Sequence, residues 1–331
     1  MLARPSFVRL NIFQVRLDKS AGPFRRALQY ALYDWTQDMP RFRRLLTMAG
    51  LLVQLAALSL ALAAKTKPFM FLSILIYMCG LCLMNGMLTS EFVRKMLLES
   101  DQIAAERIQQ TLHPQRVEEL PGYQVEMFYK PLRGVGGDYF DVIALSNGRT
   151  LFALADVSGK GMPAALLAAN IQALVRSISS VIADPLGLAE QVNNHLCQYT
   201  PPERFATAVF ALLSRETGEL TYVNAGQNPP ILVSPDRTTF LGPTGIPLGL
   251  LRETAFQAQR VVIPATGKLL FYTDGLTDGI GDENPEERVG AALAFPGPTI
   301  SNLQALLDPK FNEDDITLLL LTRLSLEDRR I

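Results

Sequence analysis

Two long apolar stretches stand out in the first hundred residues of the chain. Residues 45–64 and residues 69–88 each run for twenty positions with no charged side chain and at most three polar ones. A helix of about twenty apolar residues spans a hydrocarbon core about 30 Å thick. We therefore predict a transmembrane helical hairpin over residues 45–88. A pair of buried core helices is the alternative, but helices that are apolar on all faces are uncommon outside lipid.

Basic residues flank both outer ends of this hairpin, whereas the turn between its arms carries only Lys65 and Lys67. Cytoplasmic flanks of membrane proteins are enriched in lysine and arginine. We therefore expect a multi-pass protein of the cell (inner) membrane, with its N-terminus and its C-terminal part in the cytoplasm. Residues 1–44 form a basic segment. Within it, residues 24–35 are predicted either as an amphipathic helix at the lipid interface or as part of a disordered tail.

Residues 89–114 are predicted to form a linker helix after the hairpin. Between positions 91 and 112 there is no Gly or Pro, and apolar side chains recur at helical spacing. His113 and Pro114 end the pattern. This helix is expected either to pair with a second copy of the chain or to pack on its own domain.

Beyond Pro121 the apolar positions alternate with polar ones, as in half-buried strands. Two longer helical patterns, residues 162–182 and 185–198, interrupt these strands. The order of elements indicates a β-rich α+β domain over residues 115–325 rather than a regular βαβ repeat. The predicted strands cover residues 123–129, 150–156, 206–212, 219–224, 259–263, 268–273 and 316–322.

Charge divides the chain in a similar place. Residues 1–100 hold 13 Lys+Arg against 5 Asp+Glu, and the remaining residues hold 18 against 27. The basic part suits contact with anionic membrane lipid, and the acidic part argues against nucleic acid as a partner. Cys79 and Cys82 form a Cys-x-x-Cys pair inside the second apolar stretch. Membrane-compatible small side chains explain this pair better than a redox or zinc role does.

Four aspartates mark the ends of predicted strands or the glycine turns beside them: Asp138, Asp156, Asp274 and Asp314. A single Asp-Gly is usually only a turn, but four such positions can converge on a hard cation, which prefers oxygen ligands. The chain contains only two histidines. This argues against a zinc site built on imidazole.

Seven segments between residues 134 and 321 match, in order, the motifs of one family. They are GVGGDYFD at 134–141, ADVSGKGMPAAL at 155–166, FATAVF at 205–210, GELTYVNAGQNPP at 218–230, PLG at 247–249, FYTDGLTD at 271–278 and EDDITLLLL at 313–321. Together they resemble the SpoIIE-type branch of the protein phosphatase 2C superfamily. AERIQQTLHP at 105–114 resembles the linker that commonly precedes this domain, so the resemblance covers about residues 105–325.

The resemblance implies an α–β–β–α sandwich with two Mn²⁺ or Mg²⁺ ions bound between the sheets. By position, Asp156 would bridge both ions and the carbonyl of Val157 would complete the shell of one of them. Asp274 and Asp314 would bind the other ion. Asp138 would position the water at the metal centre, which makes Asp138 and Asp156 the expected catalytic residues.

Further positions have implied roles. Asp278 is the expected ligand of a third, weaker ion. Lys160 is expected either to contact phosphate or to remain an exposed lysine without a role. Gln227 stands where the family commonly has His, which puts the rate or the pH dependence of the activity in question. The helix matching residues 162–182 can act as a switch in this family, so control by a partner is expected.

The implied reaction is hydrolysis of phosphoserine or phosphothreonine on a protein by a water activated between the two ions. In this family the substrate is often an anti-sigma-factor antagonist in a bacterial partner-switching pathway. A catalytically weak or inactive module with the same fold is the alternative, which the presence of all four carboxylates disfavours. A diguanylate cyclase is a remote alternative suggested by Gly136–Gly137–Asp138. It would require Glu-Phe next and would leave the later aspartates unexplained.

The helical stripe over residues 91–112 generates a test of its own. If two copies pair through it, equilibrium sedimentation of the chain in detergent should show dimers at protein concentrations of about 10–50 µM. Replacing Ile103 and Ile108 by Glu should shift the chain to monomers, because two charges would enter the paired face. A wild-type chain that is monomeric over this range would contradict the dimer.

Overall fold

In the computed structural model, the described residues are 41–63, 66–114, 119–145, 148–182, 184–294, 299–311 and 313–325. The chain divides into two compact units, Met1–Leu98 and Glu99–Ile331. The segment predicted at the lipid interface, residues 24–35, lies outside the described residues.

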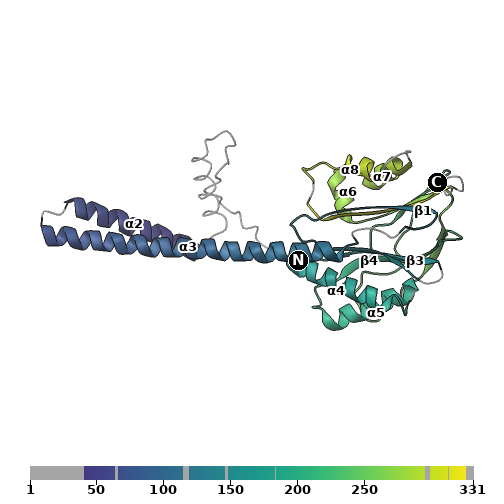
Figure 1. Ribbon diagram of the computed structural model, residues 1–331, viewed down its shortest axis with the longest axis horizontal. Helices are drawn as coiled ribbons and strands as arrows, with labels where there is room; N and C mark the ends of the chain where they lie inside the picture. Colours follow the sequence, from purple (N-terminus) through teal and green to yellow (C-terminus); the bar gives the residue numbers. More distant parts are fainter. Residues whose placement is uncertain are drawn as a thin grey trace, which may run out of the picture. The chain divides into compact units, whose positions relative to one another are not determined.

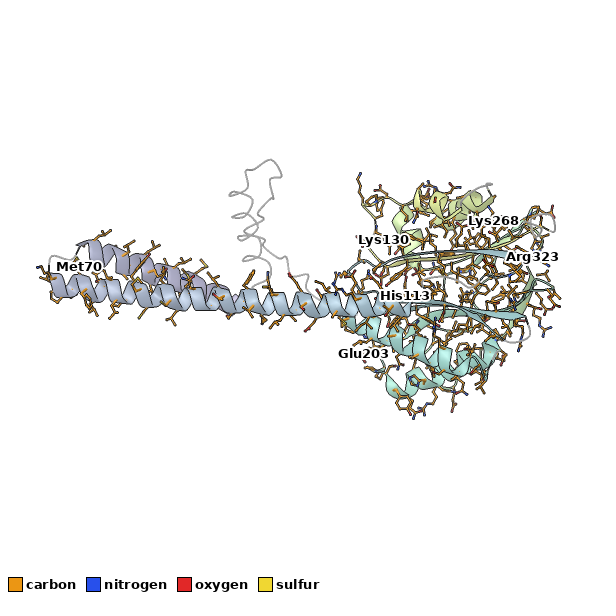
Figure 2. All side chains as sticks on the ribbon, viewed as in Figure 1. Met70, His113, Lys130, Glu203, Lys268 and Arg323 are labelled. Atoms are coloured by element: carbon orange, nitrogen blue, oxygen red, sulfur yellow. The ribbon has the colours of Figure 1, made fainter. Side chains whose placement is uncertain are left out.

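The first unit contains helix α2 (Arg41–Ala63) and the larger part of helix α3 (Lys67–Leu112). Its buried side chains include the polar Gln54 and Ser73. Along both helices large apolar side chains, Met70 among them, project outward (Figure 2). A helix pair in water buries its leucine and phenylalanine side chains, whereas this unit exposes them and buries small or polar side chains.

Of the described helices, α3 alone is long and apolar enough to cross a membrane, and the apolar part described in α2, Met48–Leu60, is shorter. The predicted hairpin is therefore not confirmed by length and composition. The predicted boundary at residues 88 and 89 is not a break, because α3 runs without interruption from Lys67 to Leu112. Pro68 lies in the first turn of α3, where the missing N–H costs no helical hydrogen bond.

The second unit is built around two five-stranded sheets whose paired strands are all antiparallel. In the first sheet the order is β1 (Tyr123–Lys130), β10 (Ile316–Arg323), β9 (Lys268–Tyr272), β6 (Ile231–Val233) and β7 (Thr238–Phe240). In the second sheet it is β2 (Asp138–Ala144), β3 (Arg149–Val157), β4 (Ala206–Ser214), β5 (Glu219–Ala225) and β8 (Gln259–Val262).

Helices cover the outer faces of both sheets (Figure 1). Helices α4 (Met162–Ile178) and α5 (Pro185–Tyr199) pack on the second sheet. Helices α6 (Asp274–Ile280), α7 (Pro285–Ala294) and α8 (Thr299–Gln304) pack on the first. This arrangement confirms the predicted α–β–β–α sandwich.

Strand β3 shows how one segment serves two layers. Leu151, Ala153 and Ala155 face α4 and α5, whereas Phe152 and Leu154 lie between the sheets. Side chains alternate across a strand, so each strand of this sandwich presents one set of residues to the helices and the other set to the opposite sheet. Both sets in β3 are apolar because both faces are covered.

Strands β2, β6 and β7 were not predicted from the sequence. Strands β6 and β7 are only three residues long. Strand β2 carries a carboxylate, Asp141, in its middle, and this carboxylate is fully buried. Arg176 of α4 donates from Nε to Asp141 Oδ2 at 2.6 Å and from Nη2 to Oδ1 at 3.0 Å. A buried carboxylate is tolerated in a strand when a bidentate arginine satisfies it, and that arginine is remote in sequence.

Candidate metal centre

Polar side chains gather at one end of the layer between the two sheets. In β2, β3 and β4 the register places Asp138 opposite Asp156, and Asp156 opposite Thr207. These three residues share the strand faces that, further along, carry the apolar contacts between the sheets. Thr273, directly after β9, and Thr317 of β10 reach the same end from the other sheet. The apolar layer therefore ends in a polar cluster.

Asp138 is the most deeply placed acid in this cluster, with 1% of its surface exposed. Thr273 Oγ1 donates a hydrogen bond to Asp138 Oδ2 at 2.9 Å, and Thr317 Oγ1 donates to the same oxygen. Burial, followed by the negative charge of Asp156, raises the pKa of Asp138 well above its ordinary value. Sequence reasoning missed both threonines because nothing local links them to Asp138.

Asp156 lies within electrostatic reach of three further carboxylates. Burial, followed by repulsion from Asp274, Asp314 and Asp315, raises the pKa of Asp156 from 3.8 to about 8. Asp274 begins α6, and its pKa is raised by burial and then by Asp314 and the neighbouring Asp278. The four predicted acids are therefore brought together from four separate segments of the chain.

Lys160 lies at the exposed edge of this cluster. Its Nζ is 2.6 Å from Asp314 Oδ2 and donates a hydrogen bond to the carbonyl of Glu313 at 2.5 Å. The hydrogen bond with Asp314 is the largest cause of the raised pKa of Lys160. The lysine predicted as a phosphate contact thus supplies a positive charge beside the carboxylates.

Asp315 is a site residue that sequence reasoning passed over in favour of its neighbour Asp314. Its Oδ1 accepts from the Leu132 N–H and its Oδ2 from the Gly137 N–H, both at 2.7 Å. A Cβ on Gly136 would lie 2.5 Å from Asp315 Oδ2, so any other residue there would displace this carboxylate. Asp315 therefore holds the loop that leads into Asp138. The signal in the sequence was the second acid of the Asp314–Asp315 pair.

The carbonyl of Val157 lies against the same loop. The Val157 N–H donates to the Gly137 carbonyl at 3.3 Å, and a Cβ on Gly137 would lie 3.1 Å from the Val157 oxygen. The next residue, Ser158, accepts from Arg204 Nη1 at 2.6 Å through its carbonyl. The two loops that carry Asp138 and Asp156 therefore support each other.

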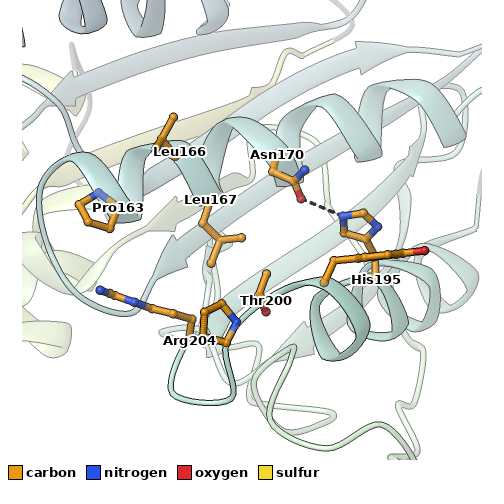
Figure 3. A pocket seen from close by; sticks show the side chains of 9 residues that line it. Pro163, Leu166, Leu167, Asn170, His195, Thr200 and Arg204 are labelled. Atoms are coloured by element: carbon orange, nitrogen blue, oxygen red, sulfur yellow. Dashed lines mark hydrogen bonds between the residues drawn. The ribbon is translucent and has the colours of Figure 1, made fainter. Parts of the chain in front are cut away.

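Arg204 also lines a pocket of about 590 Å³ between α4 and α5 (Figure 3). Leucine and proline side chains form much of its wall, and His195 Nε2 lies 2.9 Å from Asn170 Oδ1 on the opposite helix. This pocket opens on the helical side of the second sheet, whereas the acids lie between the sheets.

Gln227, the position at which the sequence departs from the family pattern, is buried. Its Nε2 donates to the Tyr272 carbonyl at 3.1 Å, and its Oε1 accepts from Thr207 Oγ1. Its own N–H donates to Asn224 Oδ1 at 2.8 Å. Gln227 thus ties β4 of one sheet to β9 of the other beside the acids, a role that its amide fulfils without a titratable group.

The donor chemistry of the cluster fits hard divalent cations. Within the part of the chain that the structure describes, no three Asp, Glu, His or Cys side chains form a closed metal-binding group. Nearby acids nevertheless raise the pKa of each of three carboxyl groups, those of Asp138, Asp156 and Asp274. A divalent cation would remove this repulsion, and carboxylate and carbonyl oxygens are the ligands that Mg²⁺ and Mn²⁺ prefer.

Two helix-covered antiparallel sheets with acids at one end of the inter-sheet layer define the protein phosphatase 2C fold. The structure titled the SiaA-PP2C domain of Pseudomonas aeruginosa matches 70% of this chain and 99% of its own chain, with a TM-score of 0.60 and 18% identity. The family model for stage II sporulation protein E (SpoIIE) matches residues 146–324. The chain belongs to the SpoIIE family.

Two curated relatives come from Bacillus subtilis (strain 168) and are named phosphoserine phosphatases. RsbP is 26% identical over 161 residues, which cover 47% of this chain and 40% of RsbP. RsbU is 25% identical over 183 residues, which cover 55% of this chain and 54% of RsbU. The match thus spans about half or less of either relative.

The repulsion within the cluster predicts the behaviour of Asp156→Asn. Because the folded-state pKa of Asp156, about 8, lies above its ordinary 3.8, the protonated acid stabilises the fold, and this contribution is lost progressively as the pH rises from about 4 to about 8. With a chelator present, thermal unfolding should show wild-type stability falling between about pH 5 and pH 8 by about 1 kcal/mol per pH unit more than that of the variant.

Adding Mn²⁺ should raise the unfolding temperature of the wild type and leave that of Asp156→Asn nearly unchanged. The matched control is Asp282→Asn, an exposed acid paired with Arg288, which should follow the wild type in both measurements. Equal responses of the wild type and Asp156→Asn to pH and to Mn²⁺ would contradict the proposed cluster.

Proposed function

We propose that this chain is a metal-dependent protein serine/threonine phosphatase. The observation that carries the proposal is the convergence of Asp138, Asp156, Asp274 and Asp314 at one end of the inter-sheet layer, in a chain of the SpoIIE family. They come from β2, β3, the start of α6 and the approach to β10. Convergence from four segments is the pattern of a built site rather than of separate turns.

In this proposal two divalent cations, Mn²⁺ or Mg²⁺, would lower the pKa of a bound water and neutralise the charge of the phosphate. Asp156 and the Val157 carbonyl would hold one ion, and Asp156 would also contribute to the other. Asp274 and Asp314 would hold the second ion, and Asp278 would serve a further, weaker one. These assignments follow the family motifs and agree with the electrostatic contacts among the acids.

Asp138 orients the attacking water in this proposal. Both threonine hydroxyls donate to its Oδ2, so Oδ1 is the oxygen left to accept a hydrogen bond from water. The same two hydrogen bonds fix the carboxylate rotamer, so that a water bound to Oδ1 would be held in one orientation. Lys160, at the exposed edge, is placed to contact the phosphoryl oxygens as they enter.

The proposed substrate is phosphoserine or phosphothreonine on a bacterial signalling protein, such as an anti-sigma-factor antagonist. The names of RsbU and RsbP as phosphoserine phosphatases support this class. A catalytically weak or inactive module of the same fold remains the competing proposal. A diguanylate cyclase is disfavoured, because the chain belongs to the SpoIIE family and its aspartates converge.

The test of activity uses the 331-residue chain in detergent with p-nitrophenyl phosphate and a phosphoserine peptide. Turnover should require Mn²⁺ or Mg²⁺ and stop with a chelator. The turnover rate of Asp156→Asn should fall by more than the factor of about 10–100 that is typical of losing a residue that only supports a ligand. Asp282→Asn, remote from the acids, should keep wild-type rates. Bound Mn²⁺ without turnover on either substrate would favour the inactive module.

We also propose that residues 45–88 anchor the chain in the inner membrane, with residues 1–44, the linker at 89–114 and the phosphatase domain at 115–325 in the cytoplasm. The outward-facing side chains of α2 and α3 support this proposal, because Leu62, Phe71 and Leu83 are each more than 70% exposed. Exposing that surface to water would cost about 25 cal/mol of free energy per Å² of apolar area.

Cysteine labelling in intact cells tests this topology. In a background with Cys79, Cys82 and Cys197 replaced by Ala, a cysteine at Thr66, between the two apolar helices, should react with a membrane-impermeant maleimide. A cysteine at Asp101 should react only after the cells are broken open. Recovery of the chain in the soluble fraction, or labelling of Asp101→Cys in intact cells, would contradict the proposal.

A further inference from the structure

The end of helix α3 is joined directly to the loop that carries Asp138. Gln109, with only 7% of its surface exposed, forms two hydrogen bonds with one backbone residue, Gly136. Its Nε2 donates to the Gly136 carbonyl at 2.7 Å, and its Oε1 accepts from the Gly136 N–H at 3.0 Å. This pairing resembles that between neighbouring strands, with a side-chain amide in place of a second backbone.

Gly136 and Gly137 are thus held one after the other by side chains from different parts of the chain. Gln109 satisfies Gly136, and Asp315 accepts from the Gly137 N–H. Asp138 follows immediately. If Gln109 lost its amide, both backbone groups of Gly136 would lose these partners inside the protein, which is unfavourable for buried polar groups. The loop would then relax, and the position of Asp138 with it.

Other contacts fix the end of α3 in place. Gln172 of α4 donates through Nε2 to the carbonyl of Leu112. His113 stacks on Phe140 of β2, with ring centroids 4.8 Å apart and an interplanar angle of 11°. Burial lowers the pKa of His113 to about 4, so this ring is neutral near pH 7. Gln109 is therefore presented to Gly136 from a docked helix end rather than from a free one.

We propose that Gln109 is a positioning residue of the metal centre, which makes divalent-cation binding depend on the docked end of α3 through its two hydrogen bonds to Gly136. The inference rests on the proposed function, because the role of Asp138 belongs to it. Nothing about Gln109 itself is acidic or nucleophilic, so its effect on the site is exerted through the backbone of the loop.

The test replaces Gln109 by Met in the 331-residue chain in detergent, which keeps the side-chain length and removes both hydrogen bonds. Binding of Mn²⁺ is followed by the electron paramagnetic resonance signal of the free ion, which requires no catalysis. The variant should bind Mn²⁺ about tenfold more weakly, as is typical when a residue supporting a metal ligand is lost. The Mn²⁺ concentration for half-maximal hydrolysis should rise in parallel, with most of the rate recovered at saturating Mn²⁺.

The matched control is Gln110→Met, one position along the same helix, where the exposed side chain donates to Glu106 Oε1 at 3.3 Å. It should bind Mn²⁺ within twofold of the wild type. If Gln109→Met does not fold, Gln109→Glu is used; its carboxylate still accepts from Gly136 but cannot donate to the carbonyl, and weaker Mn²⁺ binding is again expected.

Two outcomes would overturn the inference. Wild-type Mn²⁺ binding in a folded Gln109 variant, with or without a lower unfolding temperature, would mean that the hydrogen bonds serve stability alone. A wild-type chain that binds no Mn²⁺ would overturn the inference and the proposed function together. A wild-type chain that binds Mn²⁺ but hydrolyses neither substrate would overturn only the proposed function, because the binding comparison still decides the role of Gln109.

Discussion

Repulsion among carboxylates at one end of the inter-sheet layer is the constraint to which the surrounding structure responds. Asp138 and Asp156 lie opposite each other on adjacent strands. The charge of Asp156 raises the pKa of Asp138, and other nearby acids raise the pKa of Asp156. Charged groups removed from water require hydrogen bonds or opposite charge. Thr273 and Thr317 supply hydrogen bonds to Asp138, and Lys160 supplies a positive charge to Asp314.

The fold meets this constraint by placing its most regular part directly behind the acids. Strands β3, β4, β9 and β10 form the centre of the two sheets and are apolar on both faces, so their ends are held at fixed separation. The loops at these ends are then tied by side chains from elsewhere: Asp315 holds Gly137, and Gln109 holds Gly136. A site of like charges stays assembled because its loops are fixed by hydrogen bonds from Asp315 and Gln109 rather than by the four acids themselves.

The two units differ in where their large apolar side chains lie. The second unit has three apolar clusters, one between its sheets and one under each helical layer. In the first unit the large apolar side chains face outward and a glutamine is buried. This contrast agrees with the proposed membrane anchor, and α3 belongs to both units.

The sequence by itself determined the class of fold, seven of the ten strands found in the described residues, and helices α4 and α5, and it singled out the four acids that we propose as the metal centre. It did so because apolar periodicity and ordered motifs are local signals. It did not reveal β2, whose buried Asp141 depends on Arg176, or the threonines at Asp138, or the roles of Asp315 and Gln109. Those were decided by tertiary structure, since each is a hydrogen bond or ion pair between groups 27 to 183 residues apart.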